Sequence, residues 1–171
     1  MSHRAVLALG SNLGDRASAL QGAIDALAAD PRVRVVAASS VYRTEPVGGP
    51  EQGEFLNAVV IVDTELDSRS LLALCMSIEQ KFHRERLEHW GPRTLDVDVI
   101  AVDDIVQDDP VLILPHPRAG ERAFVCLPWL ETDPEAVLPG TGAVRDLLVH
   151  LDMSGVQRAD DVVLLMPGSV T

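Results

Sequence analysis

The sequence predicts an α+β fold built on a mainly antiparallel sheet, with helices packed against one face. Short apolar or β-branched runs alternate with two stretches of helical periodicity, and they follow the order strand, helix, strand, strand, helix, strand. This βαββαβ order is that of the split-βαβ, or ferredoxin-like, motif. A chain of 171 residues can bury its own core, so residues 1–171 are expected to form a single domain.

The first strand and helix lie near the N-terminus. Residues 5–9 form a short apolar run that ends in GSNLGD, and Leu20, Ile24 and Leu27 then recur at helical spacing. GSNLGD matches no phosphate-binding glycine pattern, so it is expected to supply turn and capping residues. Pro31 ends the helix.

Two strands and a second helix follow. A β-branched run over residues 33–41 predicts a strand that ends near Arg43, and residues 55–64 predict the next strand. Between them, residues 44–54 read TEPVGGPEQGE, whose prolines and glycines predict a long loop. A helix capped at Asp67 or the next residue is predicted from the apolar stripe that follows.

The remaining elements are a fourth strand and a C-terminal extension. The strand covers residues 95–102, and VLILPHP predicts a short strand broken by its prolines. Helical candidates near 123–130 and 144–151 are expected to extend the fold. The tail, residues 152–171, contains DVVLLMP, which is expected to be an edge strand or a loosely held segment.

Composition excludes several classes of protein. The net charge of −12 argues against a nucleic-acid partner, which requires an extended basic surface. Cys75 and Cys126 lie far apart without metal-binding spacing, so two buried thiols are expected. The N-terminus lacks a signal-peptide pattern, and no apolar run is long enough to span a membrane. A monomeric, cytoplasmic protein without a membrane partner is expected.

Two aspartates stand out in the fourth strand. Alternate side chains of a strand share a face, so Asp96 and Asp98 point the same way, with Ile100 and Val102 expected beside them. Such a pair could hold two Mg²⁺ ions that take phosphate oxygens as further ligands. The alternative is a solvated strand face. Asp is disfavoured in strands, and the face turns apolar, which favours the metal site.

Cationic and aromatic residues flank this strand. Both neighbouring stretches, FHRERLEHWGPR and HPRAGER, are expected to be loops, and they supply Arg84, Arg86, Arg93, His116, Arg118 and Arg122. Guanidinium groups bind phosphate oxygens well, but exposed charges paired with neighbouring glutamates are the simpler alternative for any one arginine. Phe55 and Phe124 are expected in a core, and Trp90 could be a core anchor or part of a lid. Asn57 could bind backbone groups or the edge of a heterocycle.

Together these motifs resemble a known family. GSNLGD, SSVYRTEPVG with FLNAVV, WGPRTLDVDVI and LPHPRAGERAFVCLPWLE are similar to 6-hydroxymethyl-7,8-dihydropterin pyrophosphokinase over about residues 4–150. The resemblance implies a ferredoxin-like enzyme of folate biosynthesis. It would transfer pyrophosphate from ATP to the pterin's hydroxymethyl group and release AMP.

The resemblance also implies roles for individual residues. Asp96 and Asp98 would hold two Mg²⁺ ions, and Asp96 would also face the substrate. Catalytic and ATP-binding roles fall on Arg84 and Arg93, with further ATP contacts from Arg86, Trp90, His116 and Arg122. The pterin site would comprise Thr44, Val47, Phe55, Asn57 and Phe124. Glu79 would help to position ligands, and the loops at residues 44–54 and 84–92 would close over ATP.

The sequence departs from the family pattern at three places, and two other functions stay open. Phe55 stands where a tyrosine is common, His89 where an arginine is frequent, and Val111 near where an arginine contacts ATP in some members. One alternative is another two-metal enzyme on this fold, such as a nucleotidyl transferase or cyclase. The other is a ligand-binding module without catalysis.

Overall fold

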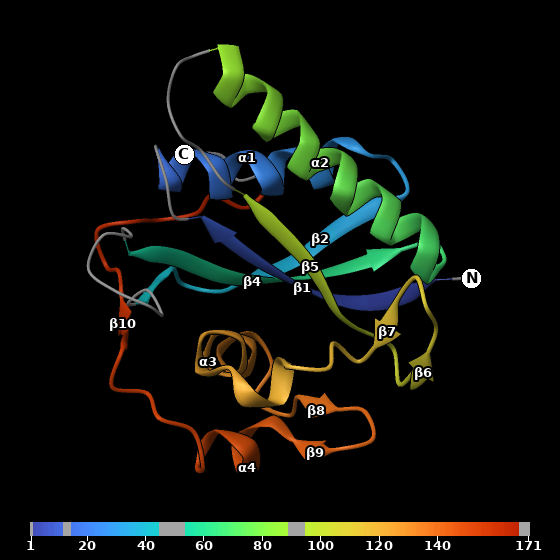
Figure 1. Cartoon of the computed structure of the whole chain (residues 1–171), viewed down its shortest axis with the longest axis vertical. Coiled ribbons are helices and arrows are strands. Elements are labelled where there is room, and N and C mark those ends of the chain that lie inside the picture. The colour runs from blue at the N-terminus through green and yellow to red at the C-terminus, as the bar shows by residue number, and fades with distance from the viewer. Residues whose placement is uncertain (1, 12–14, 45–53, 89–94, 168–171) are drawn as a thin grey trace.

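An antiparallel sheet forms the centre of the molecule, and its strand order confirms the ferredoxin-like prediction. The computed structural model describes residues 2–11, 15–44, 54–88 and 95–167, without the side chains of 84–88. The strand order is β10-β3-β4-β1-β5, and β2 also pairs with β4 (Figure 1). These strands are β1 (His3–Ser11), β2 (Val33–Ala38), β3 (Tyr42–Thr44), β4 (Phe55–Thr64), β5 (Asp96–Val102) and β10 (Val156–Arg158).

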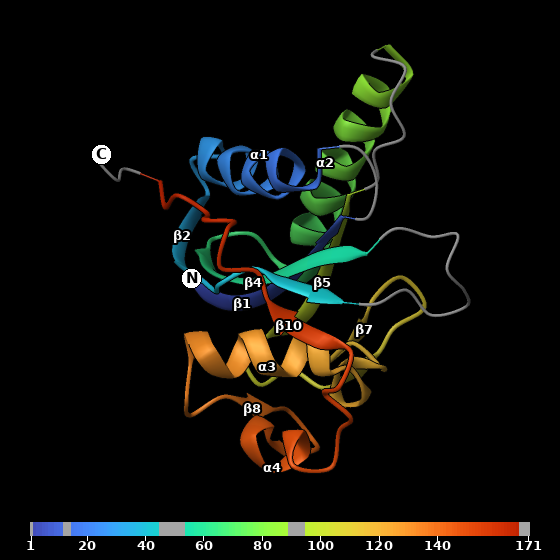
Figure 2. The same ribbon diagram turned by 90° about the vertical axis from the view of Figure 1, so that its left-hand side faces the viewer.

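Helices cover both faces of this sheet, whereas the sequence predicted one covered face. The helices α1 and α2 lie on one side and α3 and α4 on the other (Figures 1 and 2). The helices are α1 (Arg16–Ala29), α2 (Ser68–Glu88), α3 (Ala123–Thr132) and α4 (Val144–Leu148). The smaller elements are β6 (Gln107–Asp108), β7 (Ile113–Leu114), the 3₁₀ turn η1 (Ala119–Glu121), β8 (Val137–Leu138) and β9 (Gly142–Ala143).

The central strand β4 explains why both faces are covered. Val60 and Val62 belong to the core under α1 and α2, whereas Val59 and Ile61 belong to a second core that includes residues of α3 and α4. A strand that is apolar on both faces must be buried on both. The predicted C-terminal helices therefore extend the fold by covering the second face of the same sheet.

The predicted second strand is two strands. A break at Ser39 separates β2 from β3, because this residue bonds to the neighbouring strand in an irregular way. The backbone N–H of Ser39 donates to the carbonyl of Val59 at 2.8 Å. Its Oγ accepts from the N–H of Val59 at 2.9 Å and donates to the carbonyl of Ser40 at 2.7 Å. The Oγ of Ser39 thus replaces a backbone carbonyl as the acceptor for Val59, and the regular pairing of β2 with β4 ends there, before β3 begins.

The second helix begins where it was predicted but ends later. Asp67 caps it, since its Oδ1 accepts from the backbone N–H of Ser70 at 2.8 Å. The helix then continues to Glu88, so Arg84 and Arg86 lie on its last turns. The prediction that they lie in a loop was wrong. The stretch FHRERLE contains mostly good helix formers and no glycine or proline to stop it.

A β-bulge changes the face of one predicted residue. In the pairing of β1 with β5, Leu7 lies opposite Val99 and Val6 lies opposite Ala101, so Ile100 is an extra residue. Val102 consequently packs in the core under α1 and α2, not on the side of Ile100 as the simple alternation predicted. The two aspartates precede the bulge and keep their common side.

The C-terminal segment is more ordered than the expectation of a loose tail. The edge strand is β10, which pairs with β3, whereas DVVLLMP is not a strand. Val162 and Leu164 instead pack against the core under α1 and α2. In Figure 2 the segment runs from α4 across the sheet edge towards α1. Cys75 and Cys126 are buried and free, as predicted. Among the described residues, no helix is long and apolar enough to cross a membrane.

Candidate active site

A cavity of about 340 Å³ lies at the C-terminal end of β1, and most of the predicted site residues that can be placed line it. Its walls come from β1, β3, β4, β5 and the start of α3. The predicted residues that line it are Thr44, Phe55, Asn57, Asp96, Asp98, Arg122 and Phe124. The other lining residues, which the sequence did not indicate as binding residues, are Ala8, Leu9, Gly10 and Val125. Segments far apart in the sequence therefore meet at one hollow.

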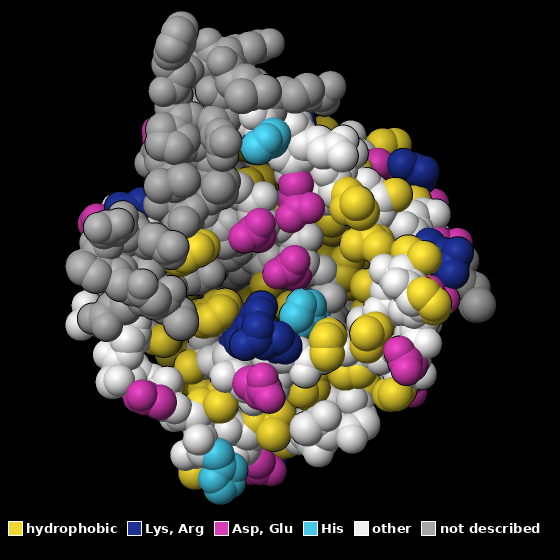
Figure 3. Space-filling view, viewed as in Figure 1, with side chains coloured by type: hydrophobic (Ala, Val, Ile, Leu, Met, Phe, Trp, Pro, Cys, Tyr) yellow, Lys and Arg dark blue, Asp and Glu magenta, His cyan; other side chains and the backbone are white. Residues whose placement is uncertain are grey.

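The two aspartates share one wall of this cavity. In the pairing of β5 with β1, Asp96 lies opposite Gly10 and Asp98 opposite Ala8. Within the described part of the chain, neither carboxylate has a hydrogen bond or an ion pair. Burial raises the pKa of Asp96 and the charge of Asp98 raises it further, while Arg122 opposes both effects. Acidic side chains gather at this hollow beside basic and histidine side chains (Figure 3).

Glu79 approaches the same strand from α2. Its Oε2 accepts a hydrogen bond from the backbone N–H of Val97, between the two aspartates, at 3.0 Å. Burial raises the pKa of Glu79, as do the charges of Asp96 and Asp98, although the bond from Val97 lowers it. Glu79 therefore holds the edge strand in place while it adds negative charge next to the pair.

The start of α3 contributes a cation and an aromatic ring. The guanidinium of Arg122 lies over the ring of Phe124, with its carbon 5.6 Å from the ring centroid. This distance is within the range of a cation–π contact. Phe55, at the start of β4, lines the same cavity. The cavity thus combines aromatic surface with one guanidinium and two carboxylates.

Asn57 is buried, and its amide is held in one orientation. Its Nδ2 donates to the Oγ1 of Thr44 at 2.7 Å, across the pairing of β3 with β4. A Cβ atom added to Gly10 would come within 3.1 Å of the Oδ1 of Asn57. Gly10 therefore lets β1 pass close to the amide. The sequence predicted a turn at Gly10, but the residue belongs to β1. A glycine at the end of an apolar strand often marks a close approach of the backbone to another group, and this position could have indicated its role.

His116 lies close to the charged groups but does not line the cavity. Its Nδ1 accepts from the backbone N–H of Arg118 at 3.2 Å. Burial lowers the pKa of His116, the charge of Asp98 opposes this shift, and Arg122 reinforces it. A neutral ring with Nδ1 as acceptor carries its proton on Nε2, which leaves that nitrogen as a donor.

Several predicted site residues cannot be placed around the cavity. Val47, Trp90 and Arg93 lie outside the described residues, as do residues 45–53 and 89–92 of the two expected closing loops. Arg84 and Arg86 are placed only as backbone, on the last turns of α2.

The residues present fit a divalent cation that takes further ligands from elsewhere. Two carboxylates on the same side of one strand, with no partner among the described residues, are suitable donors for Mg²⁺. In the described part of the chain, no group of three or more His, Cys, Asp or Glu residues could hold a metal. Mg²⁺ commonly binds to one or two protein carboxylates and completes its octahedron with water and phosphate oxygens. The pair therefore suits Mg²⁺ delivered with a nucleotide better than a structural metal.

Comparison with known proteins assigns the family. The family model described as 7,8-dihydro-6-hydroxymethylpterin-pyrophosphokinase (HPPK) matches residues 6–134. The chain belongs to the HPPK family. It is therefore a pyrophosphokinase, and the resemblance inferred from the sequence motifs is confirmed.

Three curated relatives are similar to this HPPK chain over most of its length, and all three are named 2-amino-4-hydroxy-6-hydroxymethyldihydropteridine pyrophosphokinase. The protein of Methylorubrum extorquens is 48% identical over 157 residues, which cover 92% of this chain and 99% of that protein. The protein of Mycobacterium tuberculosis is 41% identical over 174 residues, covering 96% and 90%. That of Bacillus subtilis is 40% identical over 146 residues, covering 85% and 87%.

Solved structures share the fold of this HPPK chain. The crystal structure of wild-type Plasmodium falciparum HPPK-DHPS with pteroate superimposes with a TM-score of 0.67 at 15% identity and covers 87% of this chain. A triple mutant of the same protein reaches a TM-score of 0.69, also at 15% identity. This chain spans about 44% of the longer wild-type chain. At such low identity, the similarity supports the ferredoxin-like fold alone.

Proposed function

We propose that this HPPK chain transfers the β,γ-pyrophosphoryl group of ATP to the hydroxymethyl oxygen of 6-hydroxymethyl-7,8-dihydropterin, in folate biosynthesis. The hydroxyl oxygen bonds to the β-phosphorus, and the bond from that phosphorus to the oxygen bridging it to the α-phosphate breaks. AMP leaves with that oxygen, and the hydroxyl proton passes to solvent. The observation that carries this proposal is one cavity that combines the carboxylates of Asp96 and Asp98 with Phe55, Phe124 and the amide of Asn57.

The pterin end of the site rests on the aromatic rings and the amide. Phe55 and Phe124 offer apolar faces to a flat heterocycle. The amide of Asn57 has one N–H bonded to Thr44, which leaves its carbonyl oxygen and second N–H for a heterocycle edge. Phenylalanine in place of the common tyrosine at position 55 keeps the stacking surface without the hydroxyl. Val47 would add backbone contacts to this pocket.

The triphosphate end rests on the carboxylates and the cations. Asp96 and Asp98 would hold two Mg²⁺ ions, and Asp96 would also face the attacking hydroxyl. When bound, the ions supply neutralisation of the phosphate charge. The residues proposed to bind ATP are Arg84, Arg86, Trp90, Arg93, His116 and Arg122, with Arg84 and Arg93 also catalytic. In phosphoryl transfer, positioning and charge stabilisation supply most of the rate enhancement.

Mass spectrometry of the products tests this reaction. The purified chain is incubated with ATP, MgCl₂ and the hydroxymethyl dihydropterin, and AMP with a pyrophosphorylated pterin is expected. Release of pyrophosphate would instead indicate a nucleotidyl transferase or cyclase, and ADP would indicate transfer of a single phosphoryl group. Pterin binding without turnover would leave only a binding module. That the whole chain works as one cytoplasmic, monomeric unit stays a prediction.

A further inference from the structure

A polar cluster at the far end of α3 ties this helix to the sheet. We name it the Glu131 clamp, and it consists of Ser40, Tyr42 and Glu131. The carboxylate of Glu131 accepts three hydrogen bonds. They come from the hydroxyl of Tyr42 at 2.6 Å, the backbone N–H of Ser40 at 2.8 Å and the hydroxyl of Ser40 at 3.0 Å. One side chain of α3 therefore binds both Tyr42, at the start of β3, and Ser40.

All three bonds of the clamp are charge-assisted. Each of its bonds has an ionised acceptor, and such bonds are shorter and stronger than bonds between neutral groups. Burial would raise the pKa of Glu131, but the bonds from Tyr42 and Ser40 outweigh it and lower that pKa. Burial and the bond to Glu131 raise the pKa of Tyr42 to about 12, so its hydroxyl stays a donor at neutral pH.

Both elements that the clamp joins form walls of the cavity. The helix α3 begins at Ala123, between the cavity residues Arg122 and Phe124. The strand β3 ends at Thr44, whose Oγ1 orients the amide of Asn57. In an α-helix the rise is about 1.5 Å per residue, so Glu131 acts roughly 10 Å along the axis from Phe124. The two residues are joined by this one helix, with Pro128 between them.

The clamp also lies in register with the amide. In the pairing of β3 with β4, Tyr42 lies opposite Asn57. The hydroxyl of Tyr42 is thus tied to α3, while the backbone of the same residue is tied to the strand that carries Asn57. A change in the position of Glu131 would therefore alter the separation between the ring of Phe124 and the amide of Asn57.

We propose that Glu131 is a positioning residue for the pterin-binding half of the cavity. It sets the spacing between the Phe124 wall and the Thr44–Asn57 wall, without touching the substrate itself. This inference rests on the proposed function, because the ligand whose fit it tunes is the dihydropterin. ATP binds mainly through the carboxylate and arginine end, so its binding should depend little on the clamp.

Two clamp variants and one matched control test this proposal. Glu131→Gln places an N–H₂ donor among the donors of Ser40 and Tyr42, and Tyr42→Phe removes one bond without changing the ring. The control is Asp63→Asn, which also removes charge-assisted bonds to a carboxylate but at the opposite end of β4. KM for the pterin, KM for ATP, kcat and Tm are measured for each in the presence of MgCl₂.

The expected result is a selective change in pterin affinity. Glu131→Gln should raise the KM for the pterin about fivefold or more and Tyr42→Phe about threefold, with kcat and the KM for ATP within about twofold of wild type. The double variant should resemble Glu131→Gln alone, since both changes break the same contact. Asp63→Asn should lower Tm by a similar amount and leave the pterin KM unchanged.

Other outcomes separate the two hypotheses. The positioning role is overturned if the pterin KM is unchanged in both clamp variants, or if it rises equally in Asp63→Asn. Release of AMP by the wild-type chain would still uphold the proposed function. If the wild-type chain makes no AMP, the proposed function fails by itself. Tyr42→Phe decides the positioning role if Glu131→Gln does not fold.

Discussion

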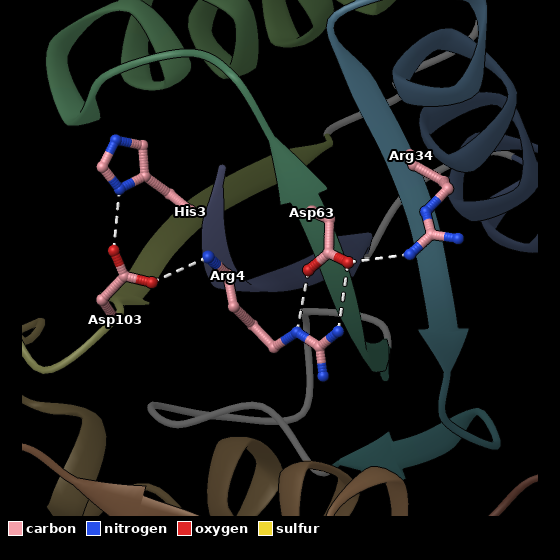
Figure 4. A network of polar contacts seen from close by, with 5 residues as sticks. All are labelled: His3, Arg4, Arg34, Asp63 and Asp103. Carbon is pink, nitrogen blue, oxygen red and sulfur yellow. Dashed lines mark hydrogen bonds and ion pairs between the residues drawn. The ribbon is translucent and has the colours of Figure 1, made fainter. Parts of the chain in front are cut away.

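The two ends of the sheet differ in whether their carboxylates are paired with cations. At the cavity end, Asp96 and Asp98 have no hydrogen-bonding or ion-pairing partner among the described residues. At the other end, Asp63 accepts a bidentate contact from Arg4 at 2.8 and 3.1 Å and a further bond from Arg34 at 2.9 Å. Figure 4 shows this network, which joins β1, β2 and β4.

A second pair completes the network at that end. The Nδ1 of His3 lies 2.7 Å from Asp103, whose other oxygen accepts from the backbone N–H of Arg4 at 2.8 Å (Figure 4). A cavity of about 420 Å³ lies beside these groups, lined in part by Arg4, Asp103 and Trp129. It is similar in size to the cavity at the aspartate pair. Its charged side chains already have partners, since Arg4 binds Asp63, Asp103 binds His3, and Asp133 accepts from the backbone N–H of Glu135. Size alone therefore does not indicate a site for a charged ligand.

The contrast between the two ends shows where charge is available for chemistry. Paired charges in the Arg4–Asp63 network stabilise the fold modestly and have little capacity left for a ligand. The neighbouring carboxylates at the cavity destabilise the fold by mutual repulsion, and bound cations would remove that cost. Substitutions at the two ends should therefore have different effects. Those at the cavity should change activity, and those in the Arg4–Asp63 network should change only stability, by a smaller amount.

Removing one carboxylate at the cavity end should have the largest effect. Asp98→Ala should lower kcat/KM for AMP formation by about 10³-fold or more, because charge neutralisation and positioning supply most of the rate in such transfers. Coupled detection of AMP measures it. Asp104→Ala, in the turn beyond β5, is the matched control and should retain activity. Near-wild-type turnover by Asp98→Ala would contradict the assignment of this site.

Crowding the amide should have the next effect. Gly10→Ala places a Cβ within 3.1 Å of the Oδ1 of Asn57, so the amide must shift by a few tenths of an ångström. The KM for the pterin is expected to rise about tenfold, with a smaller change in kcat, because the edge contact is lost in ground and transition states alike. Steady-state kinetics at saturating ATP measures this. If the KM for ATP rises instead, the amide does not serve the pterin.

Local patterns were sufficient to predict the central feature of the candidate site. The two-residue period of a strand places Asp96 and Asp98 on the same side, whatever the strand pairs with. Asn57 could likewise be identified as a polar exception in an apolar strand. Its partner Thr44 could be named only from the family resemblance, because their contact depends on the register between β3 and β4.

The errors arose where pairing or docking decides the structure. The face of Val102 changes because of a bulge, and a bulge is a property of two strands and not of one sequence pattern. The covering of the second face by α3 and α4 depends on how distant segments pack. Glu131 was missed for the same reason, since a glutamate on a helix carries no sign that its partners are Ser40 and Tyr42.

At the paired end, breaking the network should reduce stability without affecting activity. The hydrogen bond from Arg4 lowers the pKa of Asp63 despite partial burial, and Arg34 lowers it further. A lowered folded-state pKa adds stability above the ordinary carboxyl pKa of about 4, and this is lost as the pH falls through the folded value. Asp63→Asn should therefore cost about 0.5–1 kcal/mol at pH 7, since the arginines are exposed and screened.

Denaturant unfolding at several pH values measures this loss. The stability curves of wild type and Asp63→Asn should converge once the pH lies below the lowered folded-state pKa of Asp63, where the carboxyl group is protonated in both states. A constant difference down to that pH would show that packing, and not charge pairing, causes the loss.

The smallest effect should be a gain in stability at the cavity end, opposite to the loss expected for Asp63→Asn. Burial and Asp98 raise the pKa of Asp96. The folded state then binds protons more tightly than the unfolded state, so the stability of the metal-free protein falls as the pH rises from about 4 through that raised value. Asp96→Asn removes this cost, and it should stabilise the metal-free chain at pH 7 by a few tenths of a kcal/mol after solvent screening.

Magnesium should reverse the order of the two proteins. With MgCl₂ and a non-hydrolysable ATP analogue, wild type should gain Tm through preferential binding to the folded state, whereas Asp96→Asn should gain much less. Differential scanning calorimetry with and without both ligands measures the crossover. Because Asp63→Asn keeps both cavity carboxylates, it should gain as much Tm as wild type. If Asp96→Asn is instead less stable than wild type without metal, the carboxylate has a stabilising partner, and the contrast between the two ends fails.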